Sequence, residues 1–174
     1  MLINLTDVFT SDGKVKKESC PYGSEQVFYM GNSYPIREKS DVSITFTNIG
    51  TGKILVQGGM QLTLVIPCDR CLEDVTVPLT IEFTHQIVSP EREEAVSKEE
   101  EQGFMSGYQL DTEVLINSEI LINMPVKVLC REDCKGICKN CGQNLNKGDC
   151  GCDTFVPDPR MAAIKDIFNA NKEV

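Results

Sequence analysis

Alternating apolar and polar residues mark three strands in the middle of the chain. In residues 41–50, Val42, Ile44 and Phe46 alternate with polar residues, the period of two that a half-buried strand shows. The same alternation recurs in residues 53–66 and 75–83, and short turn sequences separate the three segments. This pattern predicts an antiparallel β-meander or a partial barrel.

Glycine and proline modify these predicted strands. The pair Gly58-Gly59 predicts a bulge or bend within residues 53–66. Pro78 has no backbone N–H to donate, so residues 75–83 belong at an edge of the sheet or at a bulge. A short strand is expected at residues 26–30, and the rest of residues 1–40 is poorly patterned. We interpret that region as an arm or an edge element.

A helix is predicted over residues 111–124. Asp111 can cap its start and Pro125 ends it. The isoleucines of this segment leave a strand open as the alternative. In the helical interpretation, four apolar residues lie on roughly one face: Leu110, Val114, Leu121 and Met124.

A second helix is predicted over residues 157–170. Asp158 is the cap and Pro159 takes the first turn. Its apolar stripe is expected to dock onto the sheet. Together these elements predict an α+β fold with one or two helices and a C-terminal cysteine-rich zinc-binding segment. The expected division is a mainly β domain at 1–128 and a zinc-binding segment at 129–174, with the C-terminal helix packed on it.

An acidic loop is predicted over residues 89–109. Residues 91–101 within it hold six glutamates. Such charge runs are typical of solvated segments, because a chain that buries little apolar surface cannot offset its ordering entropy. The alternative is that these glutamates bind a basic partner.

Nine cysteines carry the clearest chemical signal, and eight of them form four short pairs. The pairs are Cys68 and Cys71, Cys130 and Cys134, Cys138 and Cys141, and Cys150 and Cys152. Zinc takes four soft ligands in a tetrahedron, and C-x2-C turns supply two sulfurs to one ion. Gly142 follows one such turn, where a positive φ is needed. Cys20 is left over as a free or buried thiol.

Two groupings of the eight cysteines are open. In the local grouping, Cys138, Cys141, Cys150 and Cys152 form one site, and the other four cysteines form a second. In the crossed grouping, Cys68 and Cys71 join Cys138 and Cys141. The local grouping is favoured because short loops close at lower entropic cost. Two zinc ions are therefore expected, with one as the alternative.

Three other uses of these thiols compete with zinc. No secretory signal is visible, which argues against disulfides in a reducing cytosol. Iron–sulfur ligation uses the same thiolates and stays open. A redox C-x2-C normally lies in a βαβ setting, whereas Cys68 and Cys71 lie between apparent antiparallel strands.

The net charge of the chain indicates which class of partner it binds. The formal net charge is −9, which argues against a protein that grips nucleic acid mainly through phosphates and favours a basic partner such as a ribosomal protein. One stretch is locally basic and could touch RNA or a partner, or compensate the thiolates. Its residues are Lys127, Arg131, Lys135, Lys139 and Lys147.

No catalytic arrangement is evident in the sequence. His85 is the single histidine and is interpreted as structural. Four cysteines per site leave no open position of the kind that a catalytic zinc needs. No apolar run approaches the ~20 residues of a membrane helix. We therefore expect a cytoplasmic protein that is not an enzyme and has no small-molecule substrate.

Three blocks resemble a known family. They are PCDRCLEDVTVPL (67–79), MPVKVLCREDCKGICKNCGQNLNKGDCGC (124–152) and DPRMAAIKDIF (158–168). They resemble the bacterial YceD-like proteins, also called large ribosomal RNA subunit accumulation proteins, and the cysteine-rich version is similar to members from Firmicutes. The resemblance implies a ribosome-biogenesis role in synthesis, processing or stability of 23S ribosomal RNA. The alternatives are a zinc-stapled adaptor for a ribosomal protein, a thiol-redox protein and a nuclease.

Overall fold

The structure, a computed structural model, describes residues 1–91 and 103–152. By their contacts these residues form two units. Among the described residues, the first comprises Met1–Pro67 and the described part of Asp74–Val128, and the second comprises Cys68–Glu73 and residues 129–152. The helix predicted at 157–170 and residues 92–101 of the glutamate run lie outside the described residues.

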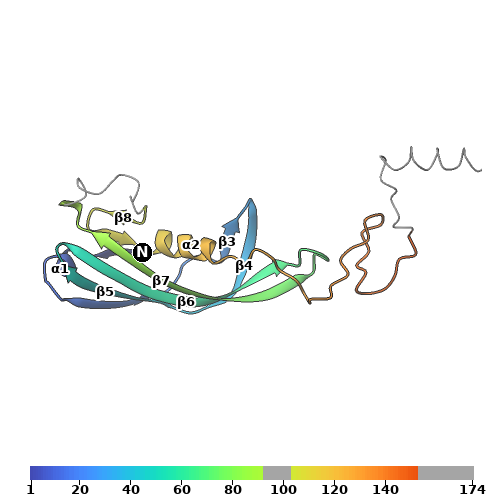
Figure 1. Cartoon of the computed structure of the whole chain (residues 1–174), viewed down its shortest axis with the longest axis horizontal. Coiled ribbons are helices and arrows are strands. Elements are labelled where there is room, and N and C mark those ends of the chain that lie inside the picture. The colour runs from blue at the N-terminus through green and yellow to red at the C-terminus, as the bar shows by residue number, and fades with distance from the viewer. Residues whose placement is uncertain (92–102, 153–174) are drawn as a thin grey trace, which may run out of the picture. The chain divides into compact units, whose positions relative to one another are not determined.

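The first unit is built around one long strand, β6 (Lys53–Pro67) (Figure 1). Strand β7 (Asp74–Val88) pairs with β6 over its whole length. On the other side of β6, β5 (Val42–Gly50) pairs with its first half and β4 (Asn32–Lys39) with its second half. All of these pairs are antiparallel, so the meander predicted over residues 41–83 is confirmed.

Residues 1–40 contribute far more structure than an arm. Strand β2 (Val15–Cys20) extends the sheet beside β5, and β3 (Gln26–Tyr29) extends it beside β4. Strand β3 matches the short strand expected at 26–30, whereas β2 and β4 were not predicted. The inward side chains of β2 include Lys16 and Glu18, which hides its alternation from an apolar pattern.

A three-stranded sheet is the second layer of the same unit. It has the order β1-β9-β8, formed by β1 (Leu2–Asn4), β8 (Met105–Ser106) and β9 (Gln109–Asp111). The loop predicted over 89–109 is therefore wrong at its end, because Phe104 and Leu110 are buried and fix these short strands. Between β1 and β2 lies the short helix α1 (Thr6–Phe9). Antiparallel sheets with two helices confirm the α+β class.

Helix α2 (Thr112–Ile122) follows β9 directly and lies over one face of the large sheet in Figure 1. The side chain of Asp111 accepts hydrogen bonds from the backbone N–H groups of the first turn, which confirms the predicted cap. None of the helices in the described part of the chain has the length and apolar content needed to cross a bilayer.

The buried face of α2 differs from the predicted one. Leu115, Ile116 and Ile120 are fully buried in the core, whereas Val114 and Leu121 are about 40% exposed. Leu110 and Met124 of the predicted stripe are buried, so that half of the prediction is confirmed. The other half is wrong because the prediction passed over the central isoleucines. Those isoleucines belong to the same buried core as sheet residues such as Ile44, Phe46 and Ile54.

His85 lies at the interface between β7 and α2. Its Nε2 is 2.7 Å from Oε1 of the buried Glu119. The rings of Phe83 and Phe104 flank the imidazole at centroid distances of 6.0 and 5.4 Å. The pair gives the buried carboxylate a hydrogen-bond partner, which a buried polar group needs.

The Gly58-Gly59 pair marks a close approach of backbones. The β6–β7 register runs without a shift from Lys53 to Pro67, so no bulge lies at these glycines, and the alternative of a bend stays a prediction. A Cβ on Gly58 would lie 2.4 Å from the carbonyl oxygen of Ser43, and one on Gly59 would lie 2.4 Å from that of Ile81. Pro78 occupies β7, which pairs with β6 alone among the described strands, so its predicted edge position is confirmed.

Alanine at Gly58 should therefore destabilise the first unit. The added Cβ would also meet the ring of Phe83 at 2.8 Å, and overpacking of this kind costs about 1–3 kcal/mol. Urea unfolding followed by far-ultraviolet circular dichroism measures the change. Gly103→Ala is the matched control, because no described residue lies within 4 Å of its Cβ position. Equal stability of the two variants would contradict the close backbone approach at Gly58.

Candidate metal centres

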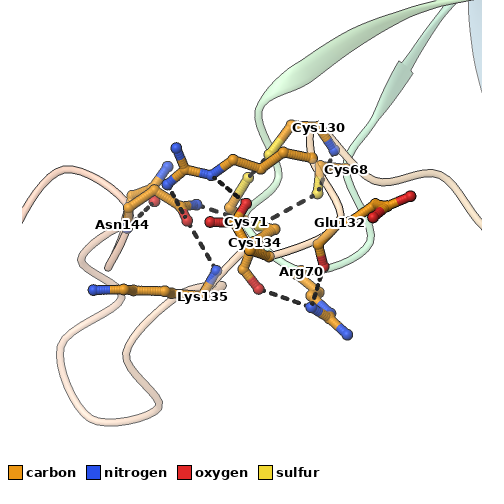
Figure 2. A network of polar contacts seen from close by, with 11 residues as sticks. Cys68, Arg70, Cys71, Cys130, Glu132, Cys134, Lys135 and Asn144 are labelled. Carbon is orange, nitrogen blue, oxygen red and sulfur yellow. Dashed lines mark hydrogen bonds and ion pairs between the residues drawn. The ribbon is translucent and has the colours of Figure 1, made fainter.

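The first cluster of thiols is formed by two segments of the second unit. Its members are Cys68, Cys71, Cys130 and Cys134, and their sulfur atoms all lie within 4.8 Å of one another. The Sγ–Sγ distance is 3.9 Å between Cys68 and Cys134 and 3.5 Å between Cys71 and Cys130 (Figure 2). Four sulfurs on one zinc ion lie ~3.8 Å apart, whereas disulfide sulfurs lie ~2 Å apart. This geometry matches sulfurs around one ion.

The second cluster lies within a single stretch of chain. It consists of Cys138, Cys141, Cys150 and Cys152, whose sulfurs also lie within 4.8 Å of one another. The structure therefore has the local grouping of the eight cysteines and not the crossed one. Three of the four thiols are buried in the first cluster, but only Cys138 is buried in the second. None of the nine cysteines forms a disulfide within the described chain.

The two C-x2-C turns have the same backbone hydrogen bonds. In the first turn the N–H of Leu72 donates to the carbonyl of Cys68 at 2.9 Å, and in the second the N–H of Gly142 donates to Cys138 at 2.9 Å. Leu72 has a φ of 61° and Gly142 has a φ of 74°. The positive φ predicted for Gly142 is confirmed. Leucine takes the same conformation in the first turn at a cost that glycine does not have.

Each cluster contains one thiol that ionises easily and another that resists ionisation. Burial raises the pKa of Cys68, but the backbone N–H groups that point at its sulfur lower that pKa to about 6. Burial and neighbouring thiols raise the pKa of Cys130 to about 12. In the second cluster, backbone N–H groups of the turn lower the pKa of Cys138 to about 6, and its neighbours, Cys141 first, raise that of Cys152 to about 12. A divalent cation would relieve this crowding of negative charge.

Metal binding should therefore release protons at neutral pH. Cys130 and Cys152 have pKa values of about 12, so both are protonated in the free clusters and must lose their protons to ligate a metal. Below about pH 6, Cys68 and Cys138 also become protonated, and the affinity for metal should fall more steeply. Zinc titration calorimetry at pH 7.5, in two buffers of different ionisation enthalpy, measures the release. Identical enthalpies in both buffers would contradict it.

Two groups that support the first cluster were not identified from the sequence. The guanidinium of Arg70 donates from Nη1 to the carbonyl oxygens of Cys134 at 2.9 Å and Glu132 at 3.4 Å (Figure 2). The side-chain amide of Asn146 donates to Sγ of Cys134 at 3.2 Å. Arg70 lies inside the C-x2-C turn, which was the available signal. Asn146 lies far along the chain from Cys130, and its role depends on the fold.

The predicted basic stretch is divided by the structure. Lys127 belongs to the first unit, whereas Arg131, Lys135, Lys139 and Lys147 belong to the second. Two of these side chains are engaged locally. Lys147 lies 2.7 Å from Glu73, and the guanidinium of Arg131 lies 3.4 Å from Asp133. The side chains of Lys135 and Lys139 are exposed.

The chain is similar in sequence to a known family and to several bacterial proteins. A family model described as "Large ribosomal RNA subunit accumulation protein YceD" matches residues 56–168. Uncharacterized proteins of Mycobacterium tuberculosis (strain ATCC 25618 / H37Rv) and Mycobacterium bovis (strain ATCC BAA-935 / AF2122/97) are each 25% identical over 134 residues. That match covers 76% of this chain and 64% of each relative.

A third relative, an uncharacterized protein of Mycobacterium leprae (strain TN), is 30% identical over 93 residues, 53% of this chain and 43% of its own length. The chain thus spans less than two thirds of these mycobacterial proteins. No solved structure is significantly similar to it.

Proposed function

Because this chain belongs to the family of large ribosomal RNA subunit accumulation proteins, we propose that it is a non-enzymatic ribosome-biogenesis factor. Its role is to support the synthesis, processing or stability of 23S ribosomal RNA. The observation that carries the proposal is the family match, which spans β7, α2 and both cysteine clusters. A cytoplasmic location follows from that role.

Each cluster holds one zinc ion in this proposal. Four thiolates fill a tetrahedral zinc, so neither ion keeps the open position that hydrolytic chemistry requires. The ions therefore have a structural role and not a catalytic one. Zinc suits isolated four-sulfur sites, and an iron–sulfur cluster is the competing occupant of the same ligand set.

The exposed lysines of the second unit are the proposed contact with RNA. Lys135 and Lys139 each lie one residue after a cluster cysteine, so metal ligation holds their backbone in place. Arg131 and Lys147 have acidic neighbours and contribute less net charge. A small cationic contact of this kind positions a rigid unit on RNA, although the chain as a whole carries a charge of −9.

A protein-binding adaptor is the second candidate, favoured by an exposed apolar surface on the first unit. Phe28 of β3 is 67% exposed, Met30 is 83% exposed and Leu121 of α2 is 40% exposed. Phe28 and Leu121 line a hollow of about 420 Å³. Exposed large apolar side chains that line one hollow are typical of protein-binding surfaces, and the net charge favours a basic partner.

Deletion of the gene tests the proposal. Cells that lack it should contain less mature 23S RNA relative to 16S RNA, and the wild-type gene should restore the ratio. Unchanged RNA levels in the deletion strain would refute the proposed role. Filter binding of precursor RNA at two salt concentrations then separates the two candidates.

Lys135→Glu with Lys139→Glu should weaken RNA binding and make its salt dependence shallower, by about one unit of slope per lost phosphate contact. Lys17→Glu with Lys53→Glu, on the large sheet, is the charge-matched control. Equal effects of the two double variants would contradict the assigned contact. Retention of a ribosomal protein after nuclease treatment, without RNA binding, would favour the adaptor.

A further inference from the structure

The segment between Cys141 and Cys150 belongs by sequence to the second cluster but contacts the first. Its central residue, Asn146, donates from Nδ2 to Sγ of Cys134 at 3.2 Å. The Oδ1 atom of Asn146 accepts from the backbone N–H of Lys135 at 2.8 Å and from Nη2 of Arg131 at 2.8 Å. One amide therefore engages a sulfur ligand of the first cluster and the chain on both sides of that ligand.

Further contacts hold the same segment in place. The N–H of Leu145 donates to the carbonyl of Gly136 at 2.9 Å, and Asn144 forms a β-bridge with Ile137. Oδ1 of Asn144 accepts from the N–H of Asn146 at 2.9 Å. These contacts fix the backbone of Asn146, so the direction of its amide depends on the order of the whole segment.

We propose that the two clusters bind metal cooperatively and that Asn146 is the positioning residue that couples them. This inference rests on the metal occupancy proposed above. Ligation at the second cluster ties both ends of the segment, at Cys141 and Cys150, and reduces the conformational entropy that its ordering costs. An ordered segment holds the amide of Asn146 on Sγ of Cys134 at 3.2 Å, where the hydrogen bond orients this sulfur toward the site of the first ion.

The coupling must act in both directions. If metal in the second cluster raises the affinity of the first, then metal in the first raises the affinity of the second by the same factor. The two clusters also differ in solvent exposure, which decides how easily a chelator reaches each ion. Cys141 is exposed, whereas three ligands of the first cluster are buried, so a chelator should reach the second cluster first, and the weakened first cluster should then lose its ion in the same transition.

A double-mutant cycle tests the proposal, with zinc as the probe in competition with a chromogenic chelator. The Kd of the first cluster is measured with the second cluster intact and with Cys141→Ser and Cys150→Ser in place. With Asn146 present, loss of the second cluster should weaken zinc binding at the first by about tenfold or more. In the Asn146→Ala background the same loss should change the Kd by less than about threefold.

Gln143→Ala is the control in the same segment, because its side chain donates to Gly148 rather than to a cluster sulfur. It should leave the tenfold effect intact. An equal effect of second-cluster loss with and without Asn146 would overturn the assigned coupling. No effect in either background would overturn cooperativity itself.

A second measurement does not require a disrupted cluster. The wild-type chain with both clusters loaded should release its two ions to the chelator in a single transition, whereas Asn146→Ala should release them in two. Two transitions in the wild type would contradict the proposal while leaving metal occupancy intact. A wild-type chain that binds no zinc would instead overturn the occupancy, and the coupling with it.

Discussion

Replacement of Cys68 by alanine is expected to remove metal from the first cluster and to unfold the second unit. The described part of that unit contributes only its cluster cysteines to the buried apolar residues, so little hydrophobic burial stabilises it otherwise. Structural zinc supplies about 10–16 kcal/mol of apparent binding free energy in zinc-finger peptides. That exceeds what so small an apolar core supplies, and loss of the ion should therefore be decisive.

Metal content and backbone amide spectra measure this outcome. We expect at least one ion fewer per chain, and collapse of the amide dispersion of residues 129–152, while the signals of the first unit persist. The first unit has its own core, in which Phe46, Leu115 and Ile116 are fully buried.

Cys20→Ala is the matched control for the same chemical change. Cys20 is 2% exposed and lies in the core of the first unit, at the end of β2. Its replacement should reduce the stability of the first unit slightly and leave the metal content unchanged. If Cys68→Ala kept the wild-type metal content and a folded second unit, the second unit would not depend on metal at the first cluster.

Replacement of Ile116 by alanine is expected to destabilise the first unit by about 2–5 kcal/mol, the range for deletion of a large aliphatic side chain in a packed core. Ile116 lies on α2 and is fully buried in the core of the first unit. Because domains are stable by only about 5–15 kcal/mol, this loss would remove a large part of the free energy of unfolding of the first unit. Urea unfolding followed by circular dichroism gives the difference in the free energy of unfolding.

Ile122→Ala, on the same helix, is the control. Ile122 is 75% exposed, so its replacement should change the free energy of unfolding by no more than about 0.5 kcal/mol. Similar losses for the two variants would mean that the buried face of α2 is assigned incorrectly.

The strands that the sequence predicted well are those with one apolar face. In β5, Val42, Ile44 and Phe46 are buried and their neighbours are not, so the period of two is visible directly. Strands β2 and β4 lack this signal. Lys16 and Glu18 lie on the inner side of β2, and β4 contains Pro35, a residue that argues against a strand when only the sequence is read. Their positions depend on pairing with β5 and β6, which a single segment does not reveal.

The two clusters followed from spacing because short pairs and short loops restrict which cysteines can meet. The side chains that support the two clusters could not be identified from spacing. Arg70 and Asn146 contribute through contacts with residues distant in the sequence, and polar residues in loops carry no periodic signal. The pair of the half-buried His85 and the buried Glu119 was missed for the same reason, since its partners lie on different elements, β7 and α2.

Elemental analysis of the purified full chain, combined with a count of free thiols, shows whether the eight paired cysteines hold metal. We expect two zinc ions per chain, and eight thiols that react with a disulfide reagent only after a chelator removes the metal. A folded chain with no bound metal, in which all nine cysteines react at once or are joined as disulfides, would contradict it.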